Sequence, residues 1–203
     1  MILNILTSFI FYFFTTYILN KTEYKSVADS VIILINSSII VISTTLFLNQ
    51  MLTSYALSNT LSFSIGFYIN DLIYNKKQVI VKSIHHFISL MGILTFPYYQ
   101  IEIAYLFQTE LSNLPLEIRN ILYKRKIKYP IINTLLIILF YILFFQMRIY
   151  NGYDLMKSIC SKDNPNDCFL TIGIYILWWY WFILITWKVF KKIVDFYIDF
   201  LVH

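Results

Sequence analysis

The stretch VADSVIILINSSIIVISTTLFL, at residues 27–48, decides the fold class of this chain. A helix needs about 20 apolar residues to cross the roughly 30 Å hydrocarbon core of a bilayer. This stretch has that length and carries Asp29 as its one charged residue. The whole chain of 203 residues has the same character, since 59% of its residues are hydrophobic and only 13% are charged. Soluble domains carry about 25% charged residues, so the composition excludes a water-soluble, collagen-like or disordered chain and predicts an integral membrane protein.

Six further apolar stretches meet or approach this length, which predicts an all-α, polytopic transmembrane helical bundle of about seven spans. The fifth predicted span is the least regular, because polar residues interrupt it and Pro115 removes a backbone donor. We therefore expect this span to be kinked, broken or partly re-entrant. The six stretches are Ile2–Leu19, Leu57–Tyr74, Val79–Phe96, Ile101–Tyr123, Ile131–Ile149 and Phe169–Phe190.

The charges in the loops predict on which side of the membrane each end of the chain lies. Lys and Arg concentrate in cytoplasmic loops, and here they gather after the first, third, fifth and seventh spans, most densely in KRKIK at 124–128. This alternation predicts a lumenal N-terminus and a cytoplasmic C-terminus. These loops account for the formal charge of +5, so nucleic acid is not an expected partner. Because no Lys or Arg precedes Lys21, we favour a retained first span over a cleaved signal peptide.

The two cysteines, Cys160 and Cys168, fall in the sixth predicted loop, on the side that the charges make lumenal. Disulfides persist in such compartments. We therefore favour a bridge that closes this polar loop, with two free thiols as the alternative.

Ionisable side chains inside membrane spans are costly, so they usually face the interior of a bundle and mark a candidate site. In the fourth span Lys82, His85, His86 and Ser89 recur at helical spacing, which predicts one polar face turned into the bundle. Lys82 lies near the predicted cytoplasmic end, where its side chain can also extend to the interface. The two histidines differ by about 100° in direction, so we expect one to react while the other packs or positions it.

The third span supplies the expected partner of these side chains. Asp71 lies beside Asn70 near the cytoplasmic end, and we expect it to pair with Lys82 or with a histidine. The alternative is a structural ion pair that holds two helices together. Gly66, on the same span, permits the close approach of a neighbouring helix.

Glu110 in the fifth span and Arg148 in the sixth are the next ionisable candidates, and a pairing between them is one expectation. Arg148 lies within a turn of the lumenal end, so it is also able to reach water. In the last span Trp178 and Trp181 lie too deep to belong only to an interfacial belt. They either line a path for an acyl chain or pack against neighbouring helices.

The motifs of soluble enzymes and of metal sites are missing from the chain, since it has no GxSxG, no Gly-rich phosphate loop, no CxxC and no HExxH. Three histidines, two of them adjacent, are too few for a di-iron oxidase. We therefore expect no bound metal and no bound cofactor, and the expected partners are membrane lipids.

Several motifs follow one another along the chain: SFSIGFYIND at 62–71, SIHHFISL at 83–90, TELSNLPLEIRNIL at 109–122, FFQMRIY at 144–150 and the Trp-rich last span with its KK ending. Their order and spacing resemble the TLC-domain family of eukaryotic membrane proteins, which includes ceramide synthases. The resemblance implies a six-helix core preceded by one extra span, in the endoplasmic reticulum or a related membrane. It divides the chain into an N-terminal span and loop (1–25), a TLC domain (26–192) and a cytoplasmic tail (193–203).

In ceramide synthases two adjacent histidines are essential to acyl transfer from acyl-coenzyme A to a sphingoid amine. The matching residues here are His85 and His86. The paired aspartates that those enzymes carry after the histidines have no counterpart, so the chain looks closer to the non-synthase branch of the family.

The resemblance therefore leaves two functions open. One is transfer of an acyl chain from acyl-coenzyme A, as co-substrate, to a lipid acceptor, with His85 or His86 as base or nucleophile oriented by Asp71 or Glu110. The other is a non-catalytic lipid-binding, lipid-sensing or lipid-trafficking role for the same polar residues. The expected substrate contacts are Lys82, Ser89, Asn70, Arg148, Trp178 and Trp181.

Overall fold

The computed structural model of the protein describes residues 2–74, 80–95, 98–127, 129–162 and 165–202. Within these ranges, the side chains at 74, 80–83, 85, 92, 95 and 192–202 are not described. The side chains of two predicted site residues, Lys82 and His85, therefore lie outside the description.

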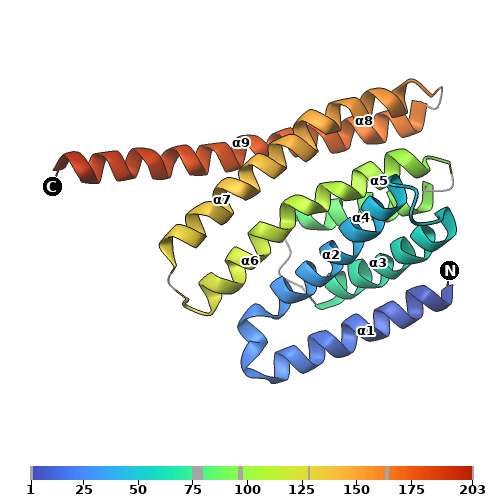
Figure 1. Ribbon diagram of the computed structural model, residues 1–203, viewed down its shortest axis with the longest axis horizontal. Coiled ribbons are helices and arrows are strands. Elements are labelled where there is room, and N and C mark those ends of the chain that lie inside the picture. Colours follow the sequence, from blue (N-terminus) through green and yellow to red (C-terminus); the bar gives the residue numbers. More distant parts are fainter. Residues whose placement is uncertain (1, 75–79, 96–97, 128, 163–164, 203) are drawn as a thin grey trace. The chain divides into compact units, whose positions relative to one another are not determined.

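Throughout the described ranges the regular structure is helical and no strand is present, which confirms the all-α fold class. The helices follow one another in seven continuous stretches that match the seven predicted spans in order. Three of these stretches combine several elements: η1 with α2, α5 with η2 and α6, and α7 with η3 and α8. The elements are α1 (Ile2–Lys21), η1 (Glu23–Val27), α2 (Ala28–Leu48), α3 (Ser54–Tyr74), α4 (Ile80–Thr95), α5 (Gln100–Gln108), η2 (Thr109–Ser112), α6 (Asn113–Lys124), α7 (Pro130–Phe144), η3 (Phe145–Tyr150), α8 (Asn151–Cys160) and α9 (Pro165–Val202) (Figure 1).

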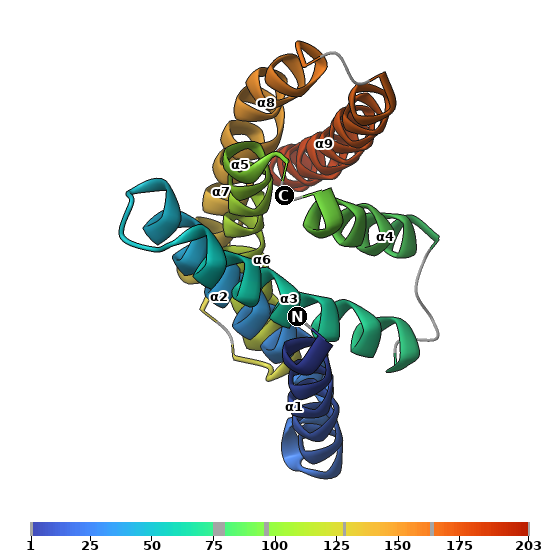
Figure 2. The ribbon, with the colours of Figure 1, turned by 90° about the vertical axis from the view of Figure 1, so that its right-hand side faces the viewer.

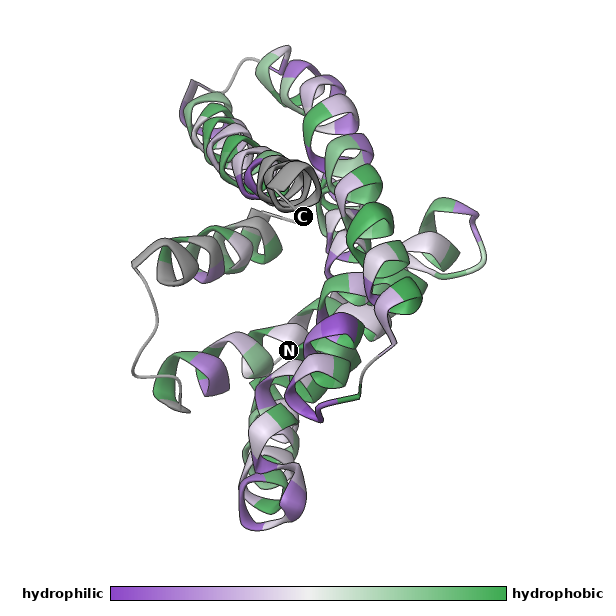
Figure 3. Cartoon of the chain, turned by 90° about the vertical axis from the view of Figure 1, so that its left-hand side faces the viewer, coloured by the Kyte–Doolittle hydropathy of each residue, from purple (hydrophilic) through white to green (hydrophobic). Residues whose placement is uncertain are grey.

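Four helical stretches of the described chain are long and apolar enough to cross a membrane. Large apolar side chains such as Ile131 and Phe169 are 75% and 80% exposed, and Figure 3 shows apolar residues along the helices. Helices that are apolar on their outer faces are stable in lipid and not in water. The protein is therefore a multi-pass membrane protein, while the exact number of spans stays a prediction. The four stretches are Ile2–Lys21, Glu23–Leu48, Pro130–Cys160 and Pro165–Lys191.

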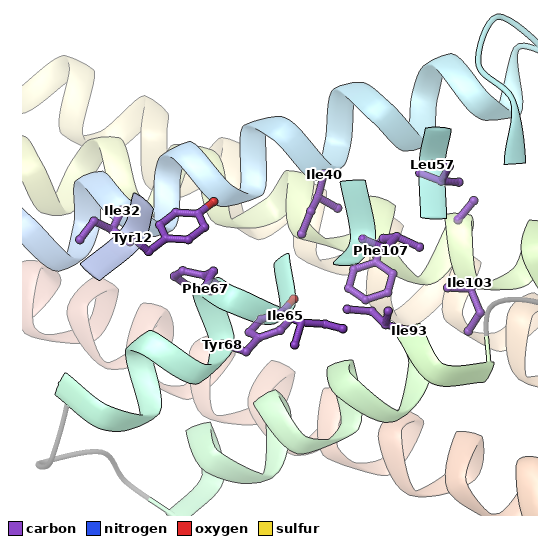
Figure 4. Packing of buried hydrophobic residues seen from close by; sticks show 12 residues of the cluster. Tyr12, Ile32, Ile40, Leu57, Ile65, Phe67, Tyr68, Ile93, Ile103 and Phe107 are labelled. Carbon is purple, nitrogen blue, oxygen red and sulfur yellow. The ribbon is translucent and has the colours of Figure 1, made fainter. Parts of the chain in front are cut away.

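The chain divides into two compact units, Met1–Phe140 and Tyr141–His203. In the first unit α1 runs along α3, α2 contacts both α5 and α6, and α3 leads into α4 (Figures 1 and 2). The apolar core of this unit draws on α1 to α5 (Figure 4). Its buried members are Tyr12, Ile32, Ile40, Leu57, Leu61, Ile65, Phe67, Tyr68, Ile93, Ile103, Ala104 and Phe107.

Gly66 allows α1 and α3 to touch. A Cβ atom added at Gly66 would lie 2.5 Å from the backbone nitrogen of Phe9 and 2.7 Å from Ser8 Cβ, which is closer than side chains tolerate. The hydroxyl of Ser8 donates a hydrogen bond to the carbonyl oxygen of Phe63 at the same place. Small residues bring backbones together in this way in membrane bundles, where packing and hydrogen bonds replace the hydrophobic effect. The first predicted span is thus part of the same bundle as the third.

The fifth helical stretch, Gln100–Lys124, is continuous but irregular. Pro115 has no N–H to give to the carbonyl of Leu111, and the chain tightens into the 3₁₀ turn η2 just before it. The expected irregularity is therefore present as a change of helical pitch at Thr109–Ser112.

The second unit is a helical hairpin in which α8 packs against α9. Cys160 and Cys168 form a disulfide with an S–S distance of 2.11 Å, which closes the loop between these helices. Gly152 on α8 makes room for Trp178 on α9, since an added Cβ would lie 2.8 Å from its ring. The helix α9 continues to Val202, through the segment expected as a cytoplasmic tail.

Candidate functional site

The centre of the candidate site is a contact between His86 on α4 and Asp71 on α3. The Nε2 atom of His86 lies 2.7 Å from the Oδ2 atom of Asp71, and the two residues are only 2% and 7% exposed. An ionised carboxylate only accepts hydrogen bonds, so the imidazole donates from Nε2 to Asp71. The structure therefore shows a histidine as a partner of Asp71, and it shows that His86 faces the bundle interior. The alternative pairing with Lys82 stays a prediction, because that side chain is not described.

Aromatic rings enclose His86 on the side of α3. The ring of Tyr68 lies 5.0 Å from the imidazole, centre to centre, and the ring of Phe67 lies 6.0 Å away. Both precede Asp71 by one helical turn, so the same face of α3 carries the rings and the carboxylate. Figure 4 shows Phe67 and Tyr68 directed into the core. The contact between His86 and Asp71 thus lies in apolar surroundings, where a hydrogen bond to a carboxylate is strong.

Asn70, which precedes Asp71 in the sequence, makes a polar contact with α1. Its Nδ2 atom donates to the hydroxyl of Thr16 at 3.0 Å, and that hydroxyl donates to the carbonyl of Tyr12 at 2.7 Å. Asn70 is 2% exposed, and its Oδ1 atom receives no hydrogen bond from the part of the chain that the structure describes. A buried amide oxygen without a donor is energetically costly, and the predicted role of Asn70 as a substrate contact stays a prediction.

Tyr12 connects this region to α2. Its hydroxyl donates to Asn36 Oδ1 at 3.1 Å, and both residues are buried. Sequence reasoning missed Thr16, Tyr12 and Asn36, because it followed only ionisable groups within the spans. An amide in the middle of the apolar stretch 27–48 was the available signal, since neutral polar side chains in lipid also require a partner.

The remaining predicted residues of α4 are placed only in part. Ser89 is 6% exposed and lies one turn beyond His86, so it shares the buried face of the helix. The backbone of His85 and Lys82 belongs to α4, and their predicted roles stay predictions.

Glu110 forms a second buried polar centre in the first unit. It lies in η2, is 6% exposed, and its Oε2 atom accepts hydrogen bonds from the Ser37 hydroxyl at 3.1 Å and from Asn113 Nδ2 at 2.6 Å. A neutral hydroxyl and a neutral amide thus stabilise the carboxylate. Sequence reasoning missed Glu117, which is also buried and accepts a hydrogen bond from Asn120 Nδ2 at 3.2 Å.

Arg148 and Trp178 meet within the second unit. Arg148 lies in η3, a π-helical turn, and is only 2% exposed. The expectation that its side chain reaches water is therefore wrong. Its guanidinium lies 5.2 Å from the ring of Phe144 and 5.9 Å from that of Trp178, which are cation–π distances. Trp178 thereby packs within the α8–α9 hairpin. Trp181 is half-buried, and its predicted role along an acyl-chain path stays a prediction, as does the pairing of Glu110 with Arg148.

A pocket of about 540 Å³ lies at another place in the first unit. It opens around the turn between α2 and α3, with α5 on its far side, and none of the predicted site residues lines it. Within the described ranges, no group of three His, Cys, Asp or Glu residues is arranged to hold a metal ion.

The chain is matched by the family model of the TLC domain over residues 2–200. It therefore belongs to the TLC domain family. This membership implies a lipid-related function in a membrane. No curated protein and no solved structure matches the chain significantly.

Proposed function

We propose that the protein transfers an acyl chain from acyl-coenzyme A to a lipid acceptor, with His86 as the general base and Asp71 as the residue that orients it. The observation that carries this proposal is the 2.7 Å contact between His86 Nε2 and Asp71 Oδ2 in the buried interior. A carboxylate that holds one imidazole nitrogen fixes the tautomer and leaves the other nitrogen basic, as in hydrolase triads. The membrane would be that of the endoplasmic reticulum or a related compartment.

The proposed reaction needs one proton to move twice. His86 Nδ1 takes the proton from the hydroxyl or amine of the acceptor while that oxygen or nitrogen attacks the thioester carbonyl carbon. The tetrahedral intermediate then collapses, the C–S bond breaks, and the imidazolium returns the proton to the thiolate of coenzyme A. Asp71 stabilises the imidazolium between these two transfers.

Asn70 supports the same proposal from the acceptor side. Its buried Oδ1 atom, which receives no donor from the described chain, neighbours Asp71 in sequence. A substrate that carries an O–H or N–H would satisfy this oxygen, and an ester or hydrocarbon would not. The acceptor is therefore a lipid with a free hydroxyl or amine.

The second candidate is a non-catalytic lipid-binding or lipid-regulating protein. The aromatic packing of Tyr68 and Phe67 on a histidine that is 2% exposed favours it, because such enclosure is typical of a structural pair. In that case His86 and Asp71 hold α3 to α4.

The experiment that tests the proposal uses the purified full chain with labelled acyl-coenzyme A and a mixed lipid extract. We expect label in one lipid class with the wild type and a loss of about 10²–10⁴-fold in His86→Gln. Tyr12→Phe is the matched control, because it removes the hydrogen bond to Asn36 in the same core and leaves His86 and Asp71 unchanged. Absence of transfer by the wild type across a broad panel of donors and acceptors overturns the catalytic proposal.

A further inference from the structure

The structure joins two loops that the sequence separates by about a hundred residues. The guanidinium of Arg125, just after α6, lies 4.9 Å from the ring of Tyr24 in η1, and its Nη1 atom donates to the carbonyl oxygen of Glu23 at 3.3 Å. One residue earlier, Lys124 Nζ donates to the hydroxyl of Ser30 at 3.3 Å. These contacts fix the end of α6 against the turn between α1 and α2 (Figure 1).

This junction gathers positive charge that nothing in the described chain neutralises. We call its five exposed basic residues the basic platform: Lys21, Lys25, Lys124, Arg125 and Lys126. The acidic side chains that face the same junction are Glu23 and Asp29, both exposed. No ion pair forms between these acids and the platform within the described ranges. The N-terminal end of the η1–α2 helix lies at the same junction and adds its partial positive charge.

The backbone holds Lys126 in place on this surface. The helix α6 ends with hydrogen bonds from Lys126 N to Tyr123 O and from Ile127 N to Leu122 O, both at 3.0 Å. Lys126 then has φ 58°, in the left-handed region that helix ends usually give to glycine. A lysine therefore stands at a position where the backbone alone would favour glycine, and its charge is added to the platform.

Exposed tyrosines lie around the basic platform and indicate its depth in the membrane. Tyr17, Tyr24, Tyr123 and Tyr129 are between 45% and 76% exposed. Tyrosines gather where a helix leaves the hydrocarbon and enters the headgroup layer. The platform thus stands at the level of lipid headgroups, where the nearest phosphates are those of the lipids themselves.

We propose that the basic platform is a binding site for the phosphate of anionic phospholipid headgroups. Arg125 is held by Tyr24 and Glu23, and Lys25 and Lys126 supply free ammonium groups beside it. Such a site attracts an anionic lipid over a zwitterionic one, because the choline of the latter cancels its phosphate charge. The proposal does not depend on acyl transfer, since the residues of the basic platform are distinct from His86 and Asp71.

The test measures retention of lipid by the detergent-purified full chain, with phosphatidic acid and phosphatidylcholine as probes. We expect the wild type to prefer phosphatidic acid, and we expect Lys25→Gln/Lys126→Gln to weaken that binding by about 25-fold, since each charge near a membrane surface contributes about fivefold. In the part of the chain that the structure describes, the side chains of Lys25 and Lys126 form no hydrogen bond and no ion pair. Lys157→Gln/Lys188→Gln removes two exposed lysines of the second unit and is the matched control.

Two further experiments are included. One asks whether the site binds lipid phosphate or soluble phosphate, and the other tests the geometry of the Arg125 side chain. Inorganic phosphate and adenosine 3′,5′-bisphosphate are added as soluble competitors, and we expect neither to displace phosphatidic acid at equal concentration. Arg125→Lys keeps the charge and loses the planar stack on Tyr24, so we expect weaker binding by the folded protein. Equal binding of both lipids, equal loss in both double variants, or efficient displacement by a soluble phosphate each overturns the proposal.

Discussion

His86 and Asp71 are 15 positions apart in the chain, on different helices, and their side chains meet at 2.7 Å inside the bundle. Burying an imidazole and a carboxylate is costly because both lose their hydration. The hydrogen bond between them has to offset that cost. Removing one partner takes this hydrogen bond from the other in a buried place, so the contact contributes both to the packing of α3 on α4 and to the chemistry that we propose.

Asp71→Asn is the sharpest test of the orienting role. We expect a fall of about 10²–10⁴-fold in kcat for acyl transfer with KM nearly unchanged, because the amide keeps the size of the side chain and loses the charge that stabilises the imidazolium. Asp71→Glu restores the charge, and we expect it to recover part of the rate. If the role were only structural, both variants would lower thermal stability and leave kcat per folded molecule unchanged.

The sequence predicts the helical architecture well because each span carries its own signal. Runs of about 20 apolar residues separated by basic loops give the seven helical stretches in order. The observed helix ends differ from the predicted span ends mainly where a helix extends past its apolar run, as in α9. A helix does not have to end where the hydrocarbon core of the membrane ends.

The candidate site is predicted only in part, because its contacts join helices whose packing no single span encodes. Helical spacing places His86 and Ser89 on one face of α4, and it leaves open whether Lys82 or a histidine meets Asp71. The partners Thr16 of Asn70 and Ser37 of Glu110 come from α1 and α2 and depend on tertiary packing. The burial of Arg148 follows from the α8–α9 hairpin, and the spacing of Arg148 from the span end gave no sign of it.

Gly66→Ala tests the contact between α1 and α3. The new methyl group would meet the backbone of Phe9, which cannot move aside without shifting α1, so we expect a loss of about 1–3 kcal/mol in the free energy of unfolding. Gly173→Ala is the matched control, because an added Cβ at that helical position meets nothing within 4 Å. There we expect no loss, or a gain of about 0.5–1 kcal/mol from reduced chain entropy. Thermal unfolding in detergent measures both, and equal destabilisation by the two variants contradicts the close packing.

Cys160→Ser/Cys168→Ser tests the closure of the second unit. The bridge closes a loop with a sequence separation of 8, which corresponds to about 2–3 kcal/mol of chain entropy. We expect faster hydrogen exchange at the ends of α8 and α9 in the variant, with the exchange of α1 to α3 unchanged because those helices belong to the other unit. Reduction of the wild type by a thiol is expected to give the same pattern. An exchange change that spreads over the first unit would contradict a local role.

Ser37→Ala tests how the buried carboxylate of Glu110 is stabilised. The substitution removes a hydroxyl donor that lies 3.1 Å from Oε2 and leaves Asn113 as the partner that donates at 2.6 Å. Loss of one hydrogen bond to a buried charged acceptor costs about 1–3 kcal/mol, so we expect a clear drop in thermal stability.

Ser38→Ala is the matched control, since Ser38 neighbours Ser37 on α2, is half-buried and donates no hydrogen bond in the described structure. The double variant Ser37→Ala/Glu110→Gln is expected to recover part of the loss, because a neutral amide is less costly to leave partly unpaired than a carboxylate. Equal stability of the two alanine variants would show that the carboxylate of Glu110 does not depend on Ser37.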